Sequence, residues 1–482
     1  MSGRTILHWF RRDLRVDDNT ALLAARRDAD RVVPVFVLDD RYGDDPGIGE
    51  SRFRFLRESL EDLEAALRTA GARLIVRRGP AAIALSRLAA ETDAAAVYAN
   101  AEIGPYPEAR DREVLAALEG AGLFLRLFPD ALLVEPDALA SRTGEPYSVY
   151  SPFAKRWEAA EKRGPAGTPR LDAPQLPLSS IPLDRVRRLR DAAAAPLAPR
   201  GGAGEAARLL ARFVEDSLAG YPRDRDLPAR PGTSRLSPHL HFGTISPRAV
   251  RSAVLEAAAS GREAAAGARR FLSELAWREF FHHVLFHFPR VATESFRREM
   301  DGLAWRDSPA ALAAWKEGRT GYPFVDAGMR ELSATHWMHN RARMAAASFL
   351  TKDLHVHWRE GEAWFERELS DADLANNNGG WQWAAGTGTD AAPYFRIFNP
   401  VLQGKKFDPE GEYVRRHVPE LARVPVHRIH EPWTMTAEEE RESGCELGRD
   451  YPAPIVDHAR ERAVALAMWK ELRSRTPAEC EP

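Results

Sequence analysis

Cysteine and long apolar runs are scarce in this 482-residue sequence. The two cysteines, Cys445 and Cys480, lie near the C-terminus and outside any metal-ligand spacing, which excludes a disulfide scaffold and is typical of a reducing compartment. No segment has the apolar length that spans a bilayer, and the N-terminal MSGRTILHWFRRDLR lacks the apolar run of a secretory signal. We therefore expect a cytoplasmic protein without membrane segments.

The sequence also lacks an excess of charge of either sign. Its 68 basic and 70 acidic residues leave a net charge of −2, so a nucleic-acid partner would have to meet a local basic surface. The hydrophobic content of 44% and the charged content of 29% are typical of globular proteins. The length predicts two or more domains.

The first third of the chain alternates short β-branched runs with amphipathic helices. Strands are predicted at 5–10, 31–39, 72–79 and 94–100, and helices at 51–71, 81–92 and 109–120. This alternation predicts a Rossmann-like α/β domain over residues 1–133, with helices on the faces of a parallel sheet. The turn after the first strand reads FRRDLR in place of a glycine fingerprint, which argues against a dinucleotide at that turn.

The pattern changes twice in the rest of the chain. Residues 134–203 are rich in Pro, Gly, Ala and Ser, which predicts a long interdomain linker. Residues 204–475 show helical periodicity without strand signals, which predicts an all-helical second domain. Of the 12 tryptophans, only Trp9 and Trp157 precede residue 270.

Two segments of the helical region combine polar and aromatic residues in unusual ways. In 221–240, the small residues of PGTSRLSP could hold an anion such as a phosphate, although a plain capped helix start is the simpler interpretation of that segment alone. In 271–289, one helix stripe carries Glu274, Trp277, Arg278 and Phe281. That stripe could meet a planar, hydrogen-bonding ligand or be a partly buried helix face with a Glu274–Arg278 pair.

Metal-binding patterns in these segments are weak. His282, His283 and His287 have no carboxylate or thiolate at a matching spacing, so we interpret them as structural and expect no metal. Asp371 and Asp373 could hold a magnesium ion or be ordinary turn carboxylates.

Two more segments are rich in amides and indoles. In 336–354, Asn340, Arg343 and Met344 share a helix face, although a methionine at helical spacing usually fills a core. Residues 376–383 read NNNGGWQW, with three amides, two glycines and two indoles but no nucleophile or base. The glycines permit close approach to a flat group, and the indoles splay apart by about 200° if the segment is helical.

Taken together, the motifs resemble those of the DNA photolyase/cryptochrome family, most of all the bacterial class I photolyases that repair cyclobutane pyrimidine dimers. The resemblance covers nearly the whole chain and rests on HWFRRDLRVDDNTAL, GTSRLS, ELAWREFF, TGYPFVDAGMREL, WMHNRARM, DLANNNGGWQWAAGTGTDAAPYFRIFNP and YPAPIVDH. It implies a lyase that uses non-covalent FAD in the helical domain to split dimers in DNA under blue light. A series of long motifs in the family's order is far more specific than one short motif.

The resemblance also implies a set of flavin-binding residues. It assigns the phosphates and ribityl chain to Tyr221 and the loop from Thr233 to Ser237, an ion pair beside the flavin ring to Arg343 and Asp371, and the place facing flavin N5 to Asn377. The positions that would contact FAD are Tyr221, Thr233, Ser234, Arg235, Leu236, Ser237, Phe271, Glu274, Arg278, Asn340, Arg343, Asp371, Ala372, Asp373 and Asn377.

Electron transfer and lesion binding are assigned in the same way. Trp381, Trp358 and Trp305 match the family's tryptophan wire, and Trp383 and Trp277 match the indoles that sandwich the flipped-out dimer. Glu274 and Asn340 would hydrogen-bond the bases, and Met344 would pack on the cyclobutane side. The candidates for phosphate contacts with the DNA are Arg225, Arg278, Arg341, Arg396, Gln403 and Lys406.

The same family includes two other functions, blue-light signalling by cryptochromes and repair of (6-4) photoproducts. A cryptochrome photoreceptor is disfavoured because plant-type members usually carry Asp where this chain has Asn377, and repair of (6-4) photoproducts is disfavoured because Met344 stands where that subfamily has a histidine. A second, light-harvesting chromophore, folate or deazaflavin, is left open. We expect a monomer whose partner is damaged DNA.

Overall fold

The computed structural model describes residues 3–39, 49–141, 143–171, 176–185, 198–390 and 396–475. They divide into two compact units. Unit 1 comprises Met1–Ala194, Pro199–Gly220 and Ser234–Pro289, and unit 2 comprises Ala195–Ala198, Tyr221–Thr233 and Arg290–Pro482. Within the linker predicted at 134–203, residues 142, 172–175 and 186–197 lie outside the described residues.

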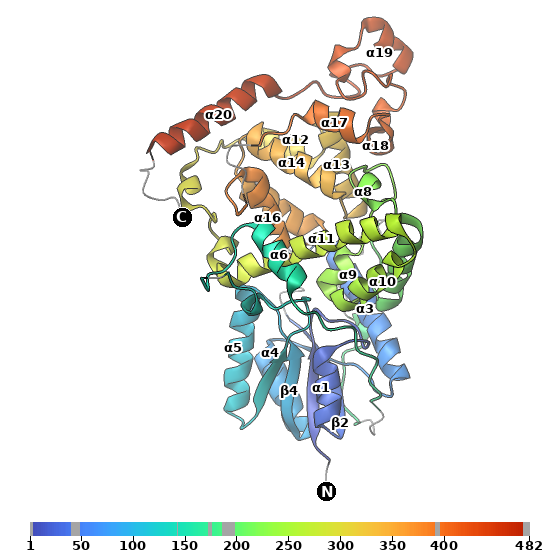
Figure 1. The fold of residues 1–482 in the computed structure, drawn as a ribbon, viewed down its shortest axis with the longest axis vertical. Coiled ribbons are helices and arrows are strands. Elements are labelled where there is room, and N and C mark those ends of the chain that lie inside the picture. Colours follow the sequence, from blue (N-terminus) through green and yellow to red (C-terminus); the bar gives the residue numbers. More distant parts are fainter. Residues whose placement is uncertain are drawn as a thin grey trace. The chain divides into compact units, whose positions relative to one another are not determined.

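A parallel sheet of five strands, in the order β3-β2-β1-β4-β5, forms the centre of unit 1 (Figure 1). Its strands are β1 (Thr5–Phe10), β2 (Arg31–Leu38), β3 (Ile75–Arg78), β4 (Ala94–Asn100) and β5 (Phe124–Phe128). The first four confirm the predicted strands, although β3 is shorter than expected. The sequence did not predict β5, because this edge strand is largely exposed and lacks a buried β-branched run.

Helices cover both faces of this sheet because alternate strand residues point to opposite sides. Leu22 of α1 (Thr20–Asp28) and Leu60 of α3 (Glu50–Thr69) share a core with Ile6 of β1. On the other face, α4 (Ala81–Thr92) and α5 (Pro105–Glu119) pack in the core that contains Leu7. The sequence thus predicted a doubly covered parallel sheet correctly.

The remaining helices of unit 1 follow the sheet in the chain. One of them, α6 (Tyr150–Ala159), lies within the predicted linker. The others are α7 (Ala203–Arg212), the π-helical turn η3 (Phe213–Ser217), α9 (Ser237–Phe242), α10 (Pro247–Ala258) and α11 (Arg262–His287).

Helices build unit 2, and no strand occurs among its described residues. They are α8 (Tyr221–Asp224), α12 (Pro309–Lys316), α13 (Pro323–Thr335), α14 (Asn340–Lys352), α15 (Trp358–Glu368), α16 (Leu374–Ala385), α17 (Pro400–Phe407), α18 (Glu412–His417), α19 (Ala437–Ser443) and α20 (His458–Arg475). Their core is centred on buried residues of α13 and α14, among them Phe324 and Phe349. In the part of the chain that the structure describes, no helix has the length and apolar character needed to cross a membrane.

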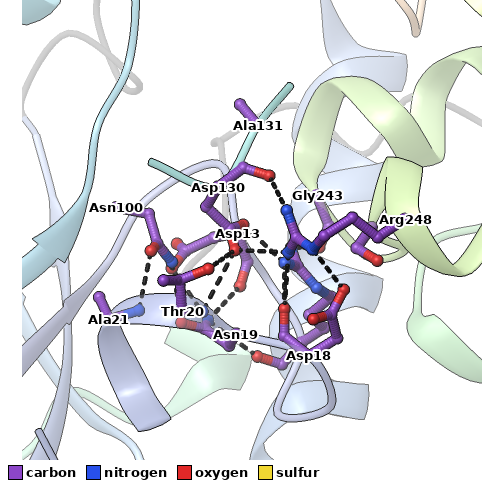
Figure 2. Close-up of polar contacts among 12 residues, drawn as sticks. Asp13, Asp18, Asn19, Thr20, Ala21, Asn100, Asp130, Ala131, Gly243 and Arg248 are labelled. Carbon is purple, nitrogen blue, oxygen red and sulfur yellow. Dashed lines mark hydrogen bonds and ion pairs between the residues drawn. The ribbon is translucent and has the colours of Figure 1, made fainter. Parts of the chain in front are cut away.

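A buried polar network fixes the turn after β1 in unit 1 (Figure 2). The Arg248 guanidinium at the start of α10 donates to the Asp18 and Asp130 carboxylates, at 2.8 Å each, and Arg15 donates to the other Asp130 oxygen at 2.6 Å. Burial alone would raise the pKa of the Asp130 carboxyl, but Arg15 and Arg248 outweigh it and lower that pKa to about 2. This network is therefore a structural lock, which ties Arg15 and Asp18 after β1, and Asp130 after β5, to α10.

The lock predicts a specific loss of acid stability. Because the pKa of Asp130 lies below its unfolded value near 3.8, its contribution to stability is present above about pH 4 and is lost as the pH falls toward 2. We expect Asp130→Asn to destabilise the protein at pH 7 by roughly 2–4 kcal/mol, since it leaves buried arginines partly uncompensated. The free energy of unfolding, measured between pH 7 and pH 2, should fall less steeply with pH below pH 4 in Asp130→Asn than in the wild-type protein.

A surface carboxylate provides the control for this measurement. Glu119 is exposed at the end of α5, so Glu119→Gln should change stability by less than about 0.5 kcal/mol. An Asp130→Asn protein as stable as the Glu119→Gln protein would show that the lock does not stabilise unit 1.

Candidate functional site

An ion pair joins α14 of unit 2 to the turn before α16 and leaves one carboxylate oxygen open. Arg343 on α14 donates from Nη2 to Asp371 Oδ2 at 2.8 Å, and its Nε donates to the Met338 carbonyl at 2.8 Å. The other oxygen, Asp371 Oδ1, is buried and accepts no hydrogen bond from any described residue. A buried acceptor without a donor is costly, so this oxygen suits an N–H group of a ligand. The predicted pair is present, next to buried Ala372.

Helix α16 begins directly after this pair. Asp373 is its N-cap and accepts from the backbone N–H of Asn376 at 3.0 Å, which places this carboxylate in a structural role. With Asp371 paired to Arg343, neither carboxylate is left as an ordinary magnesium ligand. Asn377, one turn into the helix, donates from Nδ2 to the Glu362 carbonyl at 3.0 Å. That bond orients the amide, so that the Asn377 Oδ1 atom is the group available to accept a hydrogen bond from a ligand.

Trp381 packs deep in unit 2, where α16 meets α15. Its side chain is 2% exposed and lies edge-on to Phe365 and Trp315, with ring centroids 5.0 and 6.0 Å away. A Cβ atom added to Gly361 of α15 would come within 2.0 Å of the indole, so only glycine permits this approach. Trp383 is half-buried, and the guanidinium of exposed Arg396 lies 5.8 Å from its ring. Because α16 is helical, the two indoles lie on different faces, as the sequence predicted for that case.

The other two tryptophans of the predicted wire lie on either side of a histidine. The rings of half-buried Trp305 and His357 are 5.1 Å apart, and those of His357 and Trp358 are 5.8 Å apart. Trp358 is 1% exposed, and among the described residues none accepts a hydrogen bond from its Nε1.

The predicted lesion and phosphate residues of unit 2 are accessible to different degrees. Asn340 is exposed at the start of α14, and its amide lies 3.8 Å from Met344 Sδ. Arg341 is largely buried, pairs with Asp226 at 2.7 Å and lies over the Phe407 ring. Arg225 and Gln403 are half-buried, and Arg396 and Lys406 are exposed. The last two are therefore the basic groups most available to a phosphate.

In unit 1, helix α11 carries the predicted stripe with a different pairing. Glu274 pairs with Arg270 at 3.0 Å, not with Arg278, because Arg278 donates to the Ala131 carbonyl at 3.0 Å. Trp277 stacks on Tyr150 of α6 with ring centroids 3.6 Å apart and planes 7° apart. The sequence did not single out Tyr150, because it stands in a segment predicted to be linker.

The predicted phosphate loop is divided between the two units. In unit 2, Tyr221 is buried at the start of α8, and Thr233 is half-buried. In unit 1, Arg235 adopts a left-handed conformation with φ 53°, and Ser237 begins α9 with Pro238 in the first turn. Ser234 Oγ accepts from Leu236 N at 3.4 Å, Leu236 is buried, and Phe271 is buried on α11.

The histidines of α11 bond to the backbone of unit 1. His283 Nε2 accepts from Tyr147 N at 3.0 Å, and ring nitrogens of His282 and His287 bond carbonyls of Arg278 and Pro136. Across the described ranges, the structure contains no group of three or more His, Cys, Asp or Glu side chains arranged to hold a metal ion.

Sequence reasoning missed several residues that shape the site. Gly361 admits the Trp381 indole, His357 separates two indoles, and Glu362 holds Asn377 through its carbonyl and Asn378 through its side chain. Burial raises the pKa of the Glu362 carboxyl to about 7. All three stand in HWREGE (357–362), a short stretch around Trp358 whose dense polar and glycine content was the available signal.

Comparisons with known proteins show which family the chain resembles. Residues 6–175 match the family model of DNA photolyase, and residues 271–471 match that of the FAD binding domain of DNA photolyase. A deoxyribodipyrimidine photo-lyase of Agrobacterium fabrum is 42% identical over 98% of both chains.

Two solved structures are similar along almost the whole chain. A bacterial class III photolyase from Agrobacterium tumefaciens has a TM-score of 0.93 at 41% identity, with 98% of each chain covered. A Synechocystis cryptochrome has a TM-score of 0.89 at 29% identity, covering 96% of this chain and 99% of that one. The chain therefore belongs to the DNA photolyase/cryptochrome family.

Proposed function

We propose that the protein is a light-dependent lyase that repairs cyclobutane pyrimidine dimers in DNA. The observation that carries the proposal is the buried Arg343–Asp371 pair with its open carboxylate oxygen, placed immediately before the helix that holds Asn377 and Trp381. These groups suit a planar, hydrogen-bonding ring such as a flavin. FAD, when bound, supplies light absorption and the electron that opens the dimer.

The residues of this chain bind and orient FAD in the proposal. Asp371 Oδ1 accepts from a ring N–H, Arg343 holds the carboxylate in place, and the Asn377 oxygen accepts from a protonated ring nitrogen. The small-residue loop and its neighbours hold the phosphates and ribityl chain through backbone N–H groups and hydroxyls. The remaining contacts are assigned to Tyr221, Thr233, Ser234, Arg235, Leu236, Ser237, Phe271, Ala372 and Asp373.

Lesion binding requires the two linked bases of the dimer to leave the duplex. A dimer inside the double helix cannot reach a buried ring, and photolyases are among the enzymes known to flip their target. Trp383 and Trp277 each offer an indole face for stacking, and Tyr150 covers one face of Trp277. Glu274 and Asn340 donate to or accept from base edges, Arg278 supports α11, and Met344 packs on the cyclobutane side.

The proposal also assigns an electron relay to unit 2. Trp381, Trp358 and Trp305 pass electrons inward, so that a surface donor can restore the reduced cofactor. Trp381 is buried, whereas Trp305 is half-buried, which gives the relay an inner and an outer end.

The wider proposal places this enzyme in the cytoplasm as a monomer. The near absence of cysteine supports a reducing compartment. An α/β domain over 1–133, a linker over 134–203 and a helical domain over 204–475 remain the proposed functional division of the chain. Asn377 and Met344 favour dimer repair over cryptochrome signalling or (6-4) repair.

A product-resolved repair assay tests the function directly. Purified protein should convert cyclobutane thymine dimers to thymines under blue light. It should leave (6-4) photoproducts unchanged, because Met344 stands where the (6-4) subfamily has a histidine. Repair of (6-4) products without dimer repair would overturn the proposal, and so would an inactive protein that retains its FAD.

Replacing each of the two tryptophans of α16 should impair a different activity. Trp381→Phe keeps an aromatic ring against Gly361, so FAD content should survive, but light should no longer reduce the oxidised cofactor. Chemically reduced Trp381→Phe protein should still repair dimers. Trp383→Ala should instead weaken dimer binding by roughly 1–3 kcal/mol per base while photoreduction persists. Normal photoreduction by Trp381→Phe or normal dimer binding by Trp383→Ala would refute the respective assignment.

Salt dependence tests the phosphate contacts. Because Arg396 is exposed, Arg396→Gln should weaken binding to all DNA and lower the salt slope by about one unit. Arg341 is already paired with Asp226, so Arg341→Gln should lower the slope by less. The control is Arg87, which is exposed on α4 of unit 1, and Arg87→Gln should leave the salt slope unchanged. A slope unchanged in Arg396→Gln would remove Arg396 from the interface.

A further inference from the structure

His357 lies between two tryptophans of unit 2 that are not in direct ring contact in the described structure. Its ring centroid is 5.1 Å from that of Trp305, with planes 52° apart, and 5.8 Å from that of Trp358, with planes 29° apart. An imidazole in this place contacts both the outer and the middle indole of the proposed relay. Its charge therefore acts on both indoles at short range.

A hydrogen bond fixes the protonation form of this imidazole. His357 is the N-cap of α15, and its Nδ1 accepts from the backbone N–H of Arg359 at 3.1 Å. An accepting Nδ1 carries no proton, so the neutral ring bears its proton on Nε2. Protonation of Nδ1 would break the cap and create a cation beside the first turn of the helix, where positive charge is unfavourable.

The charged neighbours of His357 come from two elements. On α15, Arg359 lies 4.7 Å from the Trp358 ring and disfavours a second cation, whereas Glu360 favours one. Asp301, on η5 (Arg298–Gly302), also favours protonation. Burial, and then Arg359, outweigh both carboxylates and lower the pKa of the His357 imidazole below its usual 6.5.

The cluster next to Trp305 is already compensated. Arg306 and His355 both pair with Glu461 of α20, at 2.8 and 2.9 Å. These groups add no unpaired charge to the surroundings of Trp305, which leaves the His357 ring as the titrating group between the indoles.

We propose that His357 is a positioning residue of the electron relay, whose neutral imidazole packs against both indoles and keeps positive charge away from them. The inference rests on the proposed function, because it presupposes that Trp358 and Trp305 carry electrons. In the electron transfer from Trp305 to Trp358, one electron leaves the Trp305 ring and reduces the Trp358 ring, which was oxidised in the preceding transfer. Trp305 becomes a radical cation, and no proton moves.

The chemistry of both partners supports an electron step without proton transfer. No residue within the described ranges accepts from Trp358 Nε1, so an oxidised Trp358 has no hydrogen-bonded base to take its proton. His357 cannot take a proton at Nε2, which already carries one, and can take one at Nδ1 only by losing its cap. An imidazolium at His357 would instead repel the positive charge that must form first on Trp358 and then on Trp305.

The expected consequence is a pH profile with a defined sign. Above pH 6.5 the imidazole is neutral and the relay works. Below the lowered pKa of His357, the yield of oxidised Trp305 should follow the neutral fraction and fall about tenfold for each pH unit. Asp353, with a pKa of about 6, and Glu362, with a pKa of about 7, titrate in the same unit, so the effect of His357 is the difference between wild type and variant.

The test uses the FAD-loaded full chain and flash spectroscopy that resolves the tryptophan radical cation from its deprotonated form. The pH is lowered from 8 to the lowest value at which the chain stays folded. His357→Asn keeps a good N-cap acceptor but cannot titrate. It should lose the acid fall seen in wild type and retain its unfolding temperature. His357→Phe keeps an aromatic ring without a titrating group and should lose the same part of the acid fall as His357→Asn. His427→Asn replaces an exposed histidine paired with Glu439 and is the control, with the wild-type profile expected.

The outcomes separate this inference from the proposed function. Trp305→Phe should abolish the long-lived tryptophan radical at every pH, and if it does not, the relay assignment fails. If Trp305→Phe abolishes the radical but His357→Asn and His357→Phe both retain the wild-type acid fall, the relay stands and the role of His357 is refuted.

Discussion

In each unit a guanidinium pairs with a buried carboxylate, but the two carboxylates differ in whether both of their oxygens have a hydrogen-bond donor. In unit 1, Asp130 has both oxygens occupied, one by Arg15 and the other by Arg248 and the Thr20 hydroxyl (Figure 2). In unit 2, Asp371 has one oxygen on Arg343 and one without a donor among the described residues. A buried charge is tolerated only when its hydrogen bonds are complete. The first pair is therefore closed and structural, whereas the second is open and needs a ligand.

The proposed relay depends on a further constraint, the close approach of α15 and α16. Gly361 has no side chain, and the Trp381 indole occupies the space that a Cβ atom would need. The same stretch of α15 supplies the Glu362 carbonyl that orients Asn377 and begins with Trp358. Helix α15 thus positions the proposed electron carrier Trp358 and the amide of Asn377 that is proposed to face the cofactor, so a change in the packing of α15 would alter both.

The fold could be predicted where burial made the sequence periodic. Strands β1 to β4 and helix α3 follow from their apolar patterns, because each buries one face or both. Strand β5 and helix α6 could not be predicted so easily, since β5 is an exposed edge and α6 stands in a Pro- and Gly-rich region. For the same reason Tyr150, which stacks on Trp277, gave no signal. The site residues themselves were reached through the family resemblance, since spacing alone left Met344 and the indoles with ordinary core interpretations.

Histidine caps show most clearly what a sequence conceals. His339 and His357 precede α14 and α15, and each accepts from the backbone N–H two residues later at 3.1 Å. Histidine is not among the favoured N-cap residues, so the helix starts at Asn340 and Trp358 carry no conventional signal. A histidine can cap in this way only while the accepting nitrogen is unprotonated. The local structure of α15 and the charge next to its first tryptophan are therefore coupled, because the protonation that would place a cation between Trp305 and Trp358 would also remove the cap of the helix.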